Sequence, residues 1–192
     1  MPSLKSNFDE LCERIERGRE FGHASFEPIY YLIFEPSRIL EVKRQTPAWI
    51  SKLRNDFGWD VKTFSVTEEI EKIISGDPRW KYWMLADKKN PKNWKPTNEA
   101  VTNALTITKS FQNRLDGFLS SLEGTGKALA LITDLEALHP YLRIGSIEAQ
   151  MQGKFRIPTV FLYPGIRVGK TNLKFLGFYP EDGNYRSVHI GG

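Results

Sequence analysis

The sequence is poor in cysteine, in long apolar runs and in net charge. Its 192 residues include one cysteine, Cys12, so no disulfide forms within the chain and a small disulfide-stapled fold is excluded. No apolar run reaches the roughly 18 residues of a membrane helix, and residues 1–20 are too charged for a signal peptide. We therefore expect a soluble, cytoplasmic protein that contacts no membrane and buries a sizeable core.

The net charge of +4, from 27 basic and 23 acidic residues, is unevenly spread along the chain. Residues 79–96 contain six basic residues and one acid, with three of the five tryptophans among them. Residues 149–180 contain five basic residues and no acid. Two basic zones therefore lie within a chain whose remainder is acidic.

Basic residues interleaved with aromatic rings are typical of a nucleic-acid surface, because the cations neutralise phosphates and the rings stack on bases. The candidates for DNA contact are Arg79, Lys81, Lys88, Lys89, Lys92, Trp94, Lys95, Lys154, Arg156, Arg167 and Lys170. The alternative is that the lysines coat a solvated helix or loop whose tryptophans anchor it to the core. The sequence leaves both interpretations open.

Continuous apolar runs and a short alternating segment predict the strands of a sheet. The predicted strands are residues 29–34, 60–65, 128–133 and 158–163. Apolar residues at helical spacing predict helices between them, at residues 4–18, 39–57, 66–75, 79–88, 97–124 and 134–152. Within the second helix, Pro47 is expected to divide the helix and Thr46 to cap its later part. Ser65 and Thr97 are the expected N-caps of two others.

Strands that alternate with helices imply right-handed crossovers and a largely parallel sheet with helices on both faces. The predicted fold is therefore α/β and Rossmann-like in the broad sense. We expect a single domain over residues 1–192, with a helical insert at about 76–126 that carries the first basic zone. Residues 173–190 alternate around a turn and predict a C-terminal β-hairpin.

Open α/β sheets bind ligands beyond the carboxyl ends of their strands. Here those positions hold Glu35, Thr133, Asp134 and a Pro164-Gly165 turn. Asp134 resembles the magnesium-binding acid of P-loop proteins, but residues 124–127 lead into a strand and residues 165–171 are one residue short of a phosphate loop. We therefore interpret Asp134 as a helix N-cap, with a degenerate nucleotide-binding regulatory domain as an alternative.

The sequence shows no complete catalytic or metal-binding pattern. The histidines are far apart in sequence, at His23, His139 and His189. Asp134, Glu136 and His139 are close enough in sequence to act as acid and base, but no nucleophile motif accompanies them. Cys12 falls on an apolar helical stripe, where it is expected to act as a small hydrophobe. We expect no enzymatic activity, no cofactor and no metal.

Four segments, taken in order, carry a resemblance to a known family. They are IYYLIFEPSRILEVKR (29–44), ALALITDLEALHPYLRIGSIEAQMQ (128–152), IPTVFLYPG (157–165) and LKFLGFYPEDGNYRSVHI (173–190). The set resembles BrxB, a component of bacteriophage exclusion (BREX) defence systems. Two motifs depart from the family pattern: Asn-Tyr-Arg replaces Tyr-Tyr-Arg, and Phe-Leu-Gly replaces Leu-Phe-Gly. Residues 76–126 have no counterpart in this resemblance and are interpreted as an insert.

The resemblance implies a cytoplasmic, non-enzymatic component of a system that methylates host DNA at adenine and excludes unmethylated phage DNA. It also implies partners, namely a PglZ-type protein of alkaline-phosphatase-like fold and the other BREX components. We expect an adaptor that docks the PglZ-type protein and supports methylation and exclusion. Direct DNA binding through residues 79–96 and 149–180 is the alternative.

The leading candidates for the partner interface are Tyr185 and Arg186, together with Arg143. Tyrosine and arginine often dominate the binding energy of interfaces. The alternative for the first two is structural, with the Tyr185 ring packed in the terminal hairpin and the Arg186 guanidinium paired with a local acid such as Asp182.

Overall fold

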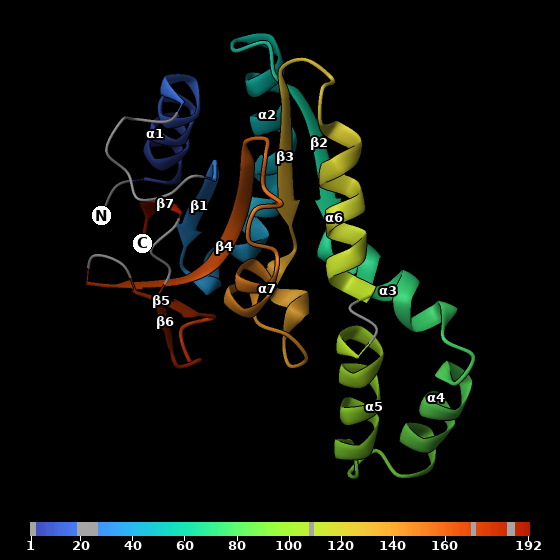
Figure 1. The fold of residues 1–192 in the computed structure, drawn as a ribbon. Helices are drawn as coiled ribbons and strands as arrows, with labels where there is room; N and C mark the ends of the chain where they lie inside the picture. Colours follow the sequence, from blue (N-terminus) through green and yellow to red (C-terminus); the bar gives the residue numbers. More distant parts are fainter. Residues whose placement is uncertain (1–2, 19–26, 108–109, 170–171, 184–186) are drawn as a thin grey trace.

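The computed structural model describes residues 3–18, 27–107, 110–169, 172–183 and 187–192. Its strands are β1 (Ile29–Phe34), β2 (Asp60–Ser65), β3 (Ala128–Thr133), β4 (Thr159–Val168), β5 (Asn172–Phe175), β6 (Glu181–Gly183) and β7 (Val188–Gly191). Its helices are α1 (Leu4–Arg17), η1 (Pro36–Arg38), α2 (Ile39–Asn55), α3 (Val66–Gly76), α4 (Trp80–Lys89), α5 (Lys95–Thr106), α6 (Ser110–Leu122), η2 (Leu135–Leu138) and α7 (Ile144–Gln150), where η marks a 3-10 helix. Figure 1 shows their arrangement.

The strands form one sheet in the order β2-β3-β4-β1-β7, with every neighbouring pair parallel. Tyr31 is paired with Phe161 on β4 and with His189 on β7, so β1 lies inside the sheet. All six residues of β1 and of β3 are buried, as the continuous apolar runs predicted. The predicted α/β fold with a mostly parallel sheet is confirmed.

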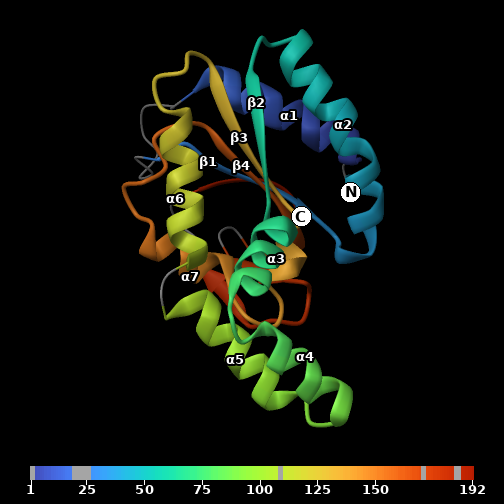
Figure 2. The same cartoon turned by 90° about the vertical axis from the view of Figure 1, so that its right-hand side faces the viewer.

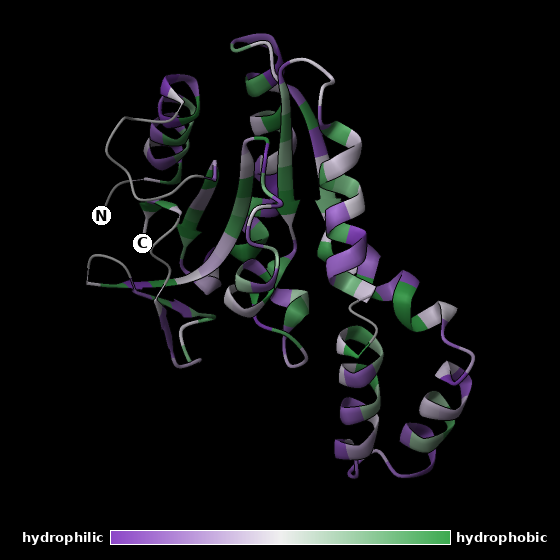
Figure 3. Ribbon diagram, viewed as in Figure 1, coloured by the Kyte–Doolittle hydropathy of each residue, from purple (hydrophilic) through white to green (hydrophobic). Residues whose placement is uncertain are grey.

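Each face of the sheet is covered by its own helices and has its own hydrophobic core. Alternate residues of β1 and β3 pack with α1 and α2 on one face, and the intervening residues pack with α3, α6 and α7 on the other. Figure 3 shows the hydrophobic residues concentrated on these strands. On the second face, the Tyr31 hydroxyl donates a hydrogen bond of 2.5 Å to the buried Glu148 carboxylate and so ties α7 to the sheet. Core burial on both faces explains why these strands are apolar throughout.

The C-terminal part adds antiparallel strands to the sheet, as predicted, but with a different pairing. β4 runs through Pro164 and Gly165 without the expected turn, and its second half pairs antiparallel with β5, which pairs with β6. β7 returns instead to the parallel part of the sheet beside β1. The apolar alternation predicted strands here, but it contained no signal for which partner each strand would take.

Two predicted helix boundaries were wrong for local reasons. Helix α2 continues through Pro47, and Thr46 does not cap a new helix because its hydroxyl donates a 2.8 Å bond back to the Val42 carbonyl. Helix α5 begins at Lys95, with Pro96 in its first turn, so Thr97 is not its N-cap. Ser65, in contrast, accepts a hydrogen bond from the Glu68 amide and caps α3 as predicted.

Two predicted long helices are each divided. The helix expected at 97–124 consists of α5 and α6, and the one expected at 134–152 consists of η2 and α7. No helix in the described part of the chain is long and apolar enough to span a membrane.

Helices α4 and α5 form an arm that projects beyond the carboxyl ends of the strands, away from the sheet (Figures 1 and 2). We call residues 79–107 the arm. It belongs to the helical segment between β2 and β3, the position that the sequence predicted for the insert. The arm is anchored by Val101, Ala104 and Leu105 of α5, which are buried, whereas α4 has no buried residue.

Candidate functional site

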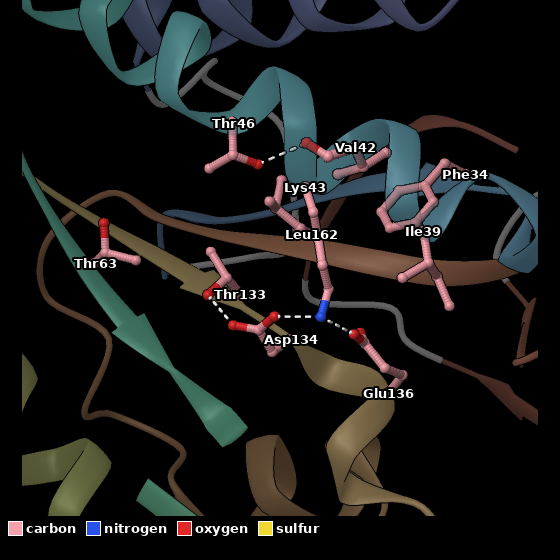
Figure 4. Close-up of a pocket in the computed structure, with 10 residues that line it drawn as sticks. All are labelled: Phe34, Ile39, Val42, Lys43, Thr46, Thr63, Thr133, Asp134, Glu136 and Leu162. Carbon is pink, nitrogen blue, oxygen red and sulfur yellow. Dashed lines mark hydrogen bonds and ion pairs between the residues drawn. The ribbon is translucent and has the colours of Figure 1, made fainter. Parts of the chain in front are cut away.

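A pocket of about 260 Å³ opens where the parallel strands end, between β3, η2 and α2 (Figure 4). One wall is apolar and is formed by Phe34, Ile39, Val42 and Leu162. The other carries the polar side chains Lys43, Thr46, Thr63, Thr133, Asp134 and Glu136. The predicted strand-end positions Thr133 and Asp134 are therefore in the pocket, which fits the usual ligand position of an open α/β sheet.

Lys43 is the centre of the polar wall. Its ammonium group lies 2.7 Å from Asp134 Oδ1 and 2.6 Å from Glu136 Oε1 (Figure 4). The second oxygen of Asp134 accepts hydrogen bonds from the hydroxyls of Thr133, at 2.7 Å, and Ser65, at 2.8 Å. These contacts connect α2, β2, β3 and η2 at one point.

Asp134 occupies the N-cap position of η2, as predicted, but its side chain does not cap the helix. Asp134 precedes η2, but its side chain forms no capping hydrogen bond and its backbone is left-handed, with φ 61° and ψ 35°. Aspartate tolerates this conformation better than most residues. The left-handed turn lets the carboxylate contact Lys43 and the two hydroxyls instead of the first amides of η2.

The protonation states of the cluster follow from these contacts. Burial raises the pKa of Asp134, but the hydrogen bonds from Lys43, Thr133 and Ser65 outweigh it, and the net pKa is below the ordinary value. Burial lowers the pKa of Lys43, but the hydrogen bonds to Asp134 and Glu136 outweigh that effect, and its net pKa is raised. At neutral pH, Asp134 is therefore a carboxylate and Lys43 an ammonium.

This arrangement is better suited to holding elements together than to catalysis. A carboxylate with a lowered pKa is a weak general base, and a protonated lysine is not a nucleophile. Two carboxylates against one ammonium also make the site negative, which opposes a phosphate ligand. Among the residues that the structure describes, no group of three or more His, Cys, Asp or Glu side chains could hold a metal ion. The cluster had no sequence motif, because Lys43 and Asp134 are far apart in the chain.

A second feature is an aromatic patch around Arg143, which we call the Arg143 patch. The Arg143 guanidinium lies 5.0 Å from the centre of the Tyr179 ring and 3.9 Å from the Asp182 carboxylate. Phe178 stacks on Tyr179 with ring centres 4.8 Å apart and is 63% exposed, and His139 hydrogen-bonds to the Tyr179 hydroxyl. The sequence singled out Arg143 but gave no signal for Phe178 and Tyr179 as its neighbours.

The other two interface candidates, Tyr185 and Arg186, lie outside the described residues. They follow Asp182 in sequence by three and four positions. Lys170, a candidate for DNA contact, and His23 are also outside the described residues.

The first basic zone lies on the arm. Lys81, Lys88, Lys89, Lys92 and Lys95 are all exposed, and Trp94 is 59% exposed. Arg79 differs from them, because its guanidinium forms two hydrogen bonds with Asp77 and lies 5.4 Å from the centre of the Trp83 ring. Trp83 packs against the core, as the solvated-helix interpretation expects, whereas Trp94 and the lysines face solvent. DNA contact through this zone stays a prediction.

Two basic residues of the second zone are paired in space with acids, Asp116 of α6 and Glu123 just after that helix. Lys154 is 3.1 Å from Asp116, and Arg156 is 3.0 Å from Glu123. Arg167 is half-buried in β4. The stretch that contains no acid in sequence therefore does not form an equally basic surface.

The family model described as BREX protein BrxB matches residues 65–190 of this chain. The chain belongs to the BrxB family. It is therefore a component of a BREX phage-defence system, whose other components are its natural partners. Neither a curated protein nor a solved structure gives a significant match.

The matched range runs from β2 to β7 and includes residues 76–126, which had no counterpart in the resemblance seen in the sequence. It begins after residues 29–44, one of the four segments that carried that resemblance. The arm therefore lies between the two ends of the matched range.

Proposed function

We propose that this chain is a non-enzymatic adaptor of its BREX system that docks a PglZ-type protein through the Arg143 patch. The observation that carries the proposal is the exposed Phe178 ring beside Tyr179 and Arg143. Aromatic and arginine side chains that lie together on a surface are typical centres of protein interfaces.

The chemistry of the strand-end pocket supports a role without catalysis. Its one lysine is held between two carboxylates, and the lowered pKa of Asp134 makes this acid a poor proton acceptor. An adaptor needs a rigid surface, and the Lys43 cluster stabilises the edge of the sheet from which η2 and the Arg143 patch extend. Support for host DNA methylation and phage exclusion would then follow from bringing the enzymatic components together.

The test is copurification of the full chain with the PglZ-type protein of its own system. We expect a complex at micromolar concentrations, weakened about tenfold or more by Phe178→Ala, since loss of an interface anchor costs about 2 kcal/mol. Arg143→Ala should also weaken it, whereas Arg44→Ala, an exposed arginine on α2, should not. The absence of a complex would refute the adaptor function, and a complex insensitive to both patch variants would refute its location.

Direct DNA binding is a second candidate, favoured by the arm. In the described structure none of its five exposed lysines forms an ion pair, so their charges are available to phosphates. This function predicts an affinity for duplex DNA that falls steeply with salt and is lost in the Lys88→Glu, Lys89→Glu, Lys92→Glu variant. Unchanged DNA binding by that variant would exclude the arm as the DNA contact.

A further inference from the structure

The outer face of α4 is apolar at its centre and basic around it. Leu85 is 63% exposed, Tyr82 is 73% exposed and Met84 is 58% exposed. Residues three and four apart are neighbours on a helix, so Leu85 has Tyr82 and Lys81 one turn before it and Lys88 and Lys89 one turn after it. Three large apolar side chains on a ten-residue helix are therefore surrounded by cations.

The opposite face of the same helix explains why these side chains are not needed for packing. Trp83 on the inner face packs against the main core and is covered by Arg79. The helix is thus already anchored through its inner side, and within the described structure nothing covers the outer one. Exposed apolar groups that gather in this way mark an interaction surface more often than a chance arrangement.

We propose that the outer face of α4 docks into an apolar groove with an acidic rim on a protein partner. Leu85 and Met84 favour a protein over DNA, because phosphates attract the lysines but offer nothing to aliphatic side chains. The charge determines the kind of groove: residues 79–96 carry six basic residues and one acid, so only an acidic rim complements them. This surface shares no residue with the Arg143 patch, and the proposal does not rest on it.

The test measures binding of the full chain to each other protein component of its own BREX system, purified separately, by biolayer interferometry at several salt concentrations. We expect one component to bind, with an affinity that falls as salt rises. Leu85→Asp should weaken this binding about tenfold or more, since it replaces an apolar side chain buried in the groove by a charged one. Lys88→Glu should weaken it most at low salt.

Matched controls separate the arm from general surface effects. Leu40→Asp changes a leucine that is 67% exposed on α2, and Lys5→Glu changes an exposed lysine on α1. Both should leave the affinity within about twofold, as surface substitutions outside an interface usually do. Circular dichroism and thermal melts of all four variants verify that they are folded, which is expected because the changed side chains are exposed.

Several results would overturn the proposal. It fails if no component binds, or if Leu85→Asp and Leu40→Asp have equal effects. It also fails if the arm variants abolish only binding to a 20-base-pair DNA duplex, because the arm then binds DNA. It fails equally if they abolish only self-association in sedimentation, because the arm then binds a second copy of the chain. The Arg143 patch is tested separately by Phe178→Ala, so failure of one surface does not imply failure of the other.

Discussion

Replacement of Lys43 by methionine is the sharpest test of the strand-end cluster. It removes the cation from between Asp134 and Glu136 while keeping the length of the aliphatic chain. The side chains of Lys43, Asp134 and Glu136 are 46%, 19% and 25% exposed, so the cluster is intermediate between a surface and a buried ion pair. We expect the free energy of unfolding at pH 7 to fall by about 1–2 kcal/mol. This value lies between the loss typical of an exposed ion pair and the loss typical of a buried pair that is deprived of one partner.

The loss should depend on pH with a definite sign. The pKa of Asp134 is lower in the folded protein than in the unfolded chain, so its stabilisation is complete above about pH 4 and is lost as the pH falls through the lowered value. In Lys43→Met, burial of Asp134 without the ammonium raises the pKa of this carboxyl, which then protonates at a higher pH than in the wild type. The difference between the wild type and the variant should therefore be largest near neutral pH and shrink below about pH 4.

Urea unfolding at pH 7 and at about pH 3, below the ordinary pKa range of a carboxyl group, provides the measurement. Lys62→Met is the matched control, because Lys62 lies 3.1 Å from Asp60 in a pair that is about half exposed, and it should cost less than about 0.5 kcal/mol. Adding Asp134→Asn to Lys43→Met should recover part of the loss, since one unpaired charge is removed. Equal losses for Lys43→Met and Lys62→Met, or a loss that does not shrink at acid pH, would refute the reasoning.

Three further predictions concern other parts of the fold, each checked by unfolding experiments. Gly165→Ala should cost about 1–3 kcal/mol, because its new methyl group would clash with the Tyr163 ring and lie 2.7 Å from the Lys174 carbonyl oxygen. Burial lowers the pKa of His189 to about 4, so stability should decline from about pH 6.5 towards pH 4, and His189→Asn should remove this decline. Leu115→Ala, at a fully buried position of α6, should cost about 2–5 kcal/mol.

The sheet was predictable because its strands are buried on both faces. Residues 128–132 have no polar side chain, and this pattern is typical of a central strand that is covered by helices on both faces. The ends of helices were less predictable. Helix α2 continues through Pro47, and the Thr46 hydroxyl donates to the Val42 carbonyl instead of capping a new helix. The spacing of apolar residues predicts neither of these two features.

The polar clusters show a different limit of sequence reasoning. Asp134 was noticed because it follows a strand, but its partner Lys43 is on a helix that precedes it by two strands and has no motif spacing to it. The distribution of charge on the surface was also not predictable from the sequence, for the same reason: the partners are distant in the chain. Residues 149–180 have no acid in sequence, yet Lys154 is paired with Asp116 of α6 and Arg156 with Glu123, just after that helix. Local composition shows where basic residues are concentrated in the sequence. The fold determines which of them are paired with acids and which remain exposed.

The exposed lysines of the arm bear on how the chain could act as the proposed adaptor. The arm and the Arg143 patch are on separate elements, and both lie beyond the carboxyl ends of the strands (Figures 1 and 2). Two partners held there would face each other across the same end of the sheet, because β4 and the helices between β2 and β3 fix both surfaces to one core. An adaptor requires two such surfaces on a rigid frame, whereas a binding module requires one. The separate losses expected for Phe178→Ala and Leu85→Asp therefore distinguish these two kinds of protein.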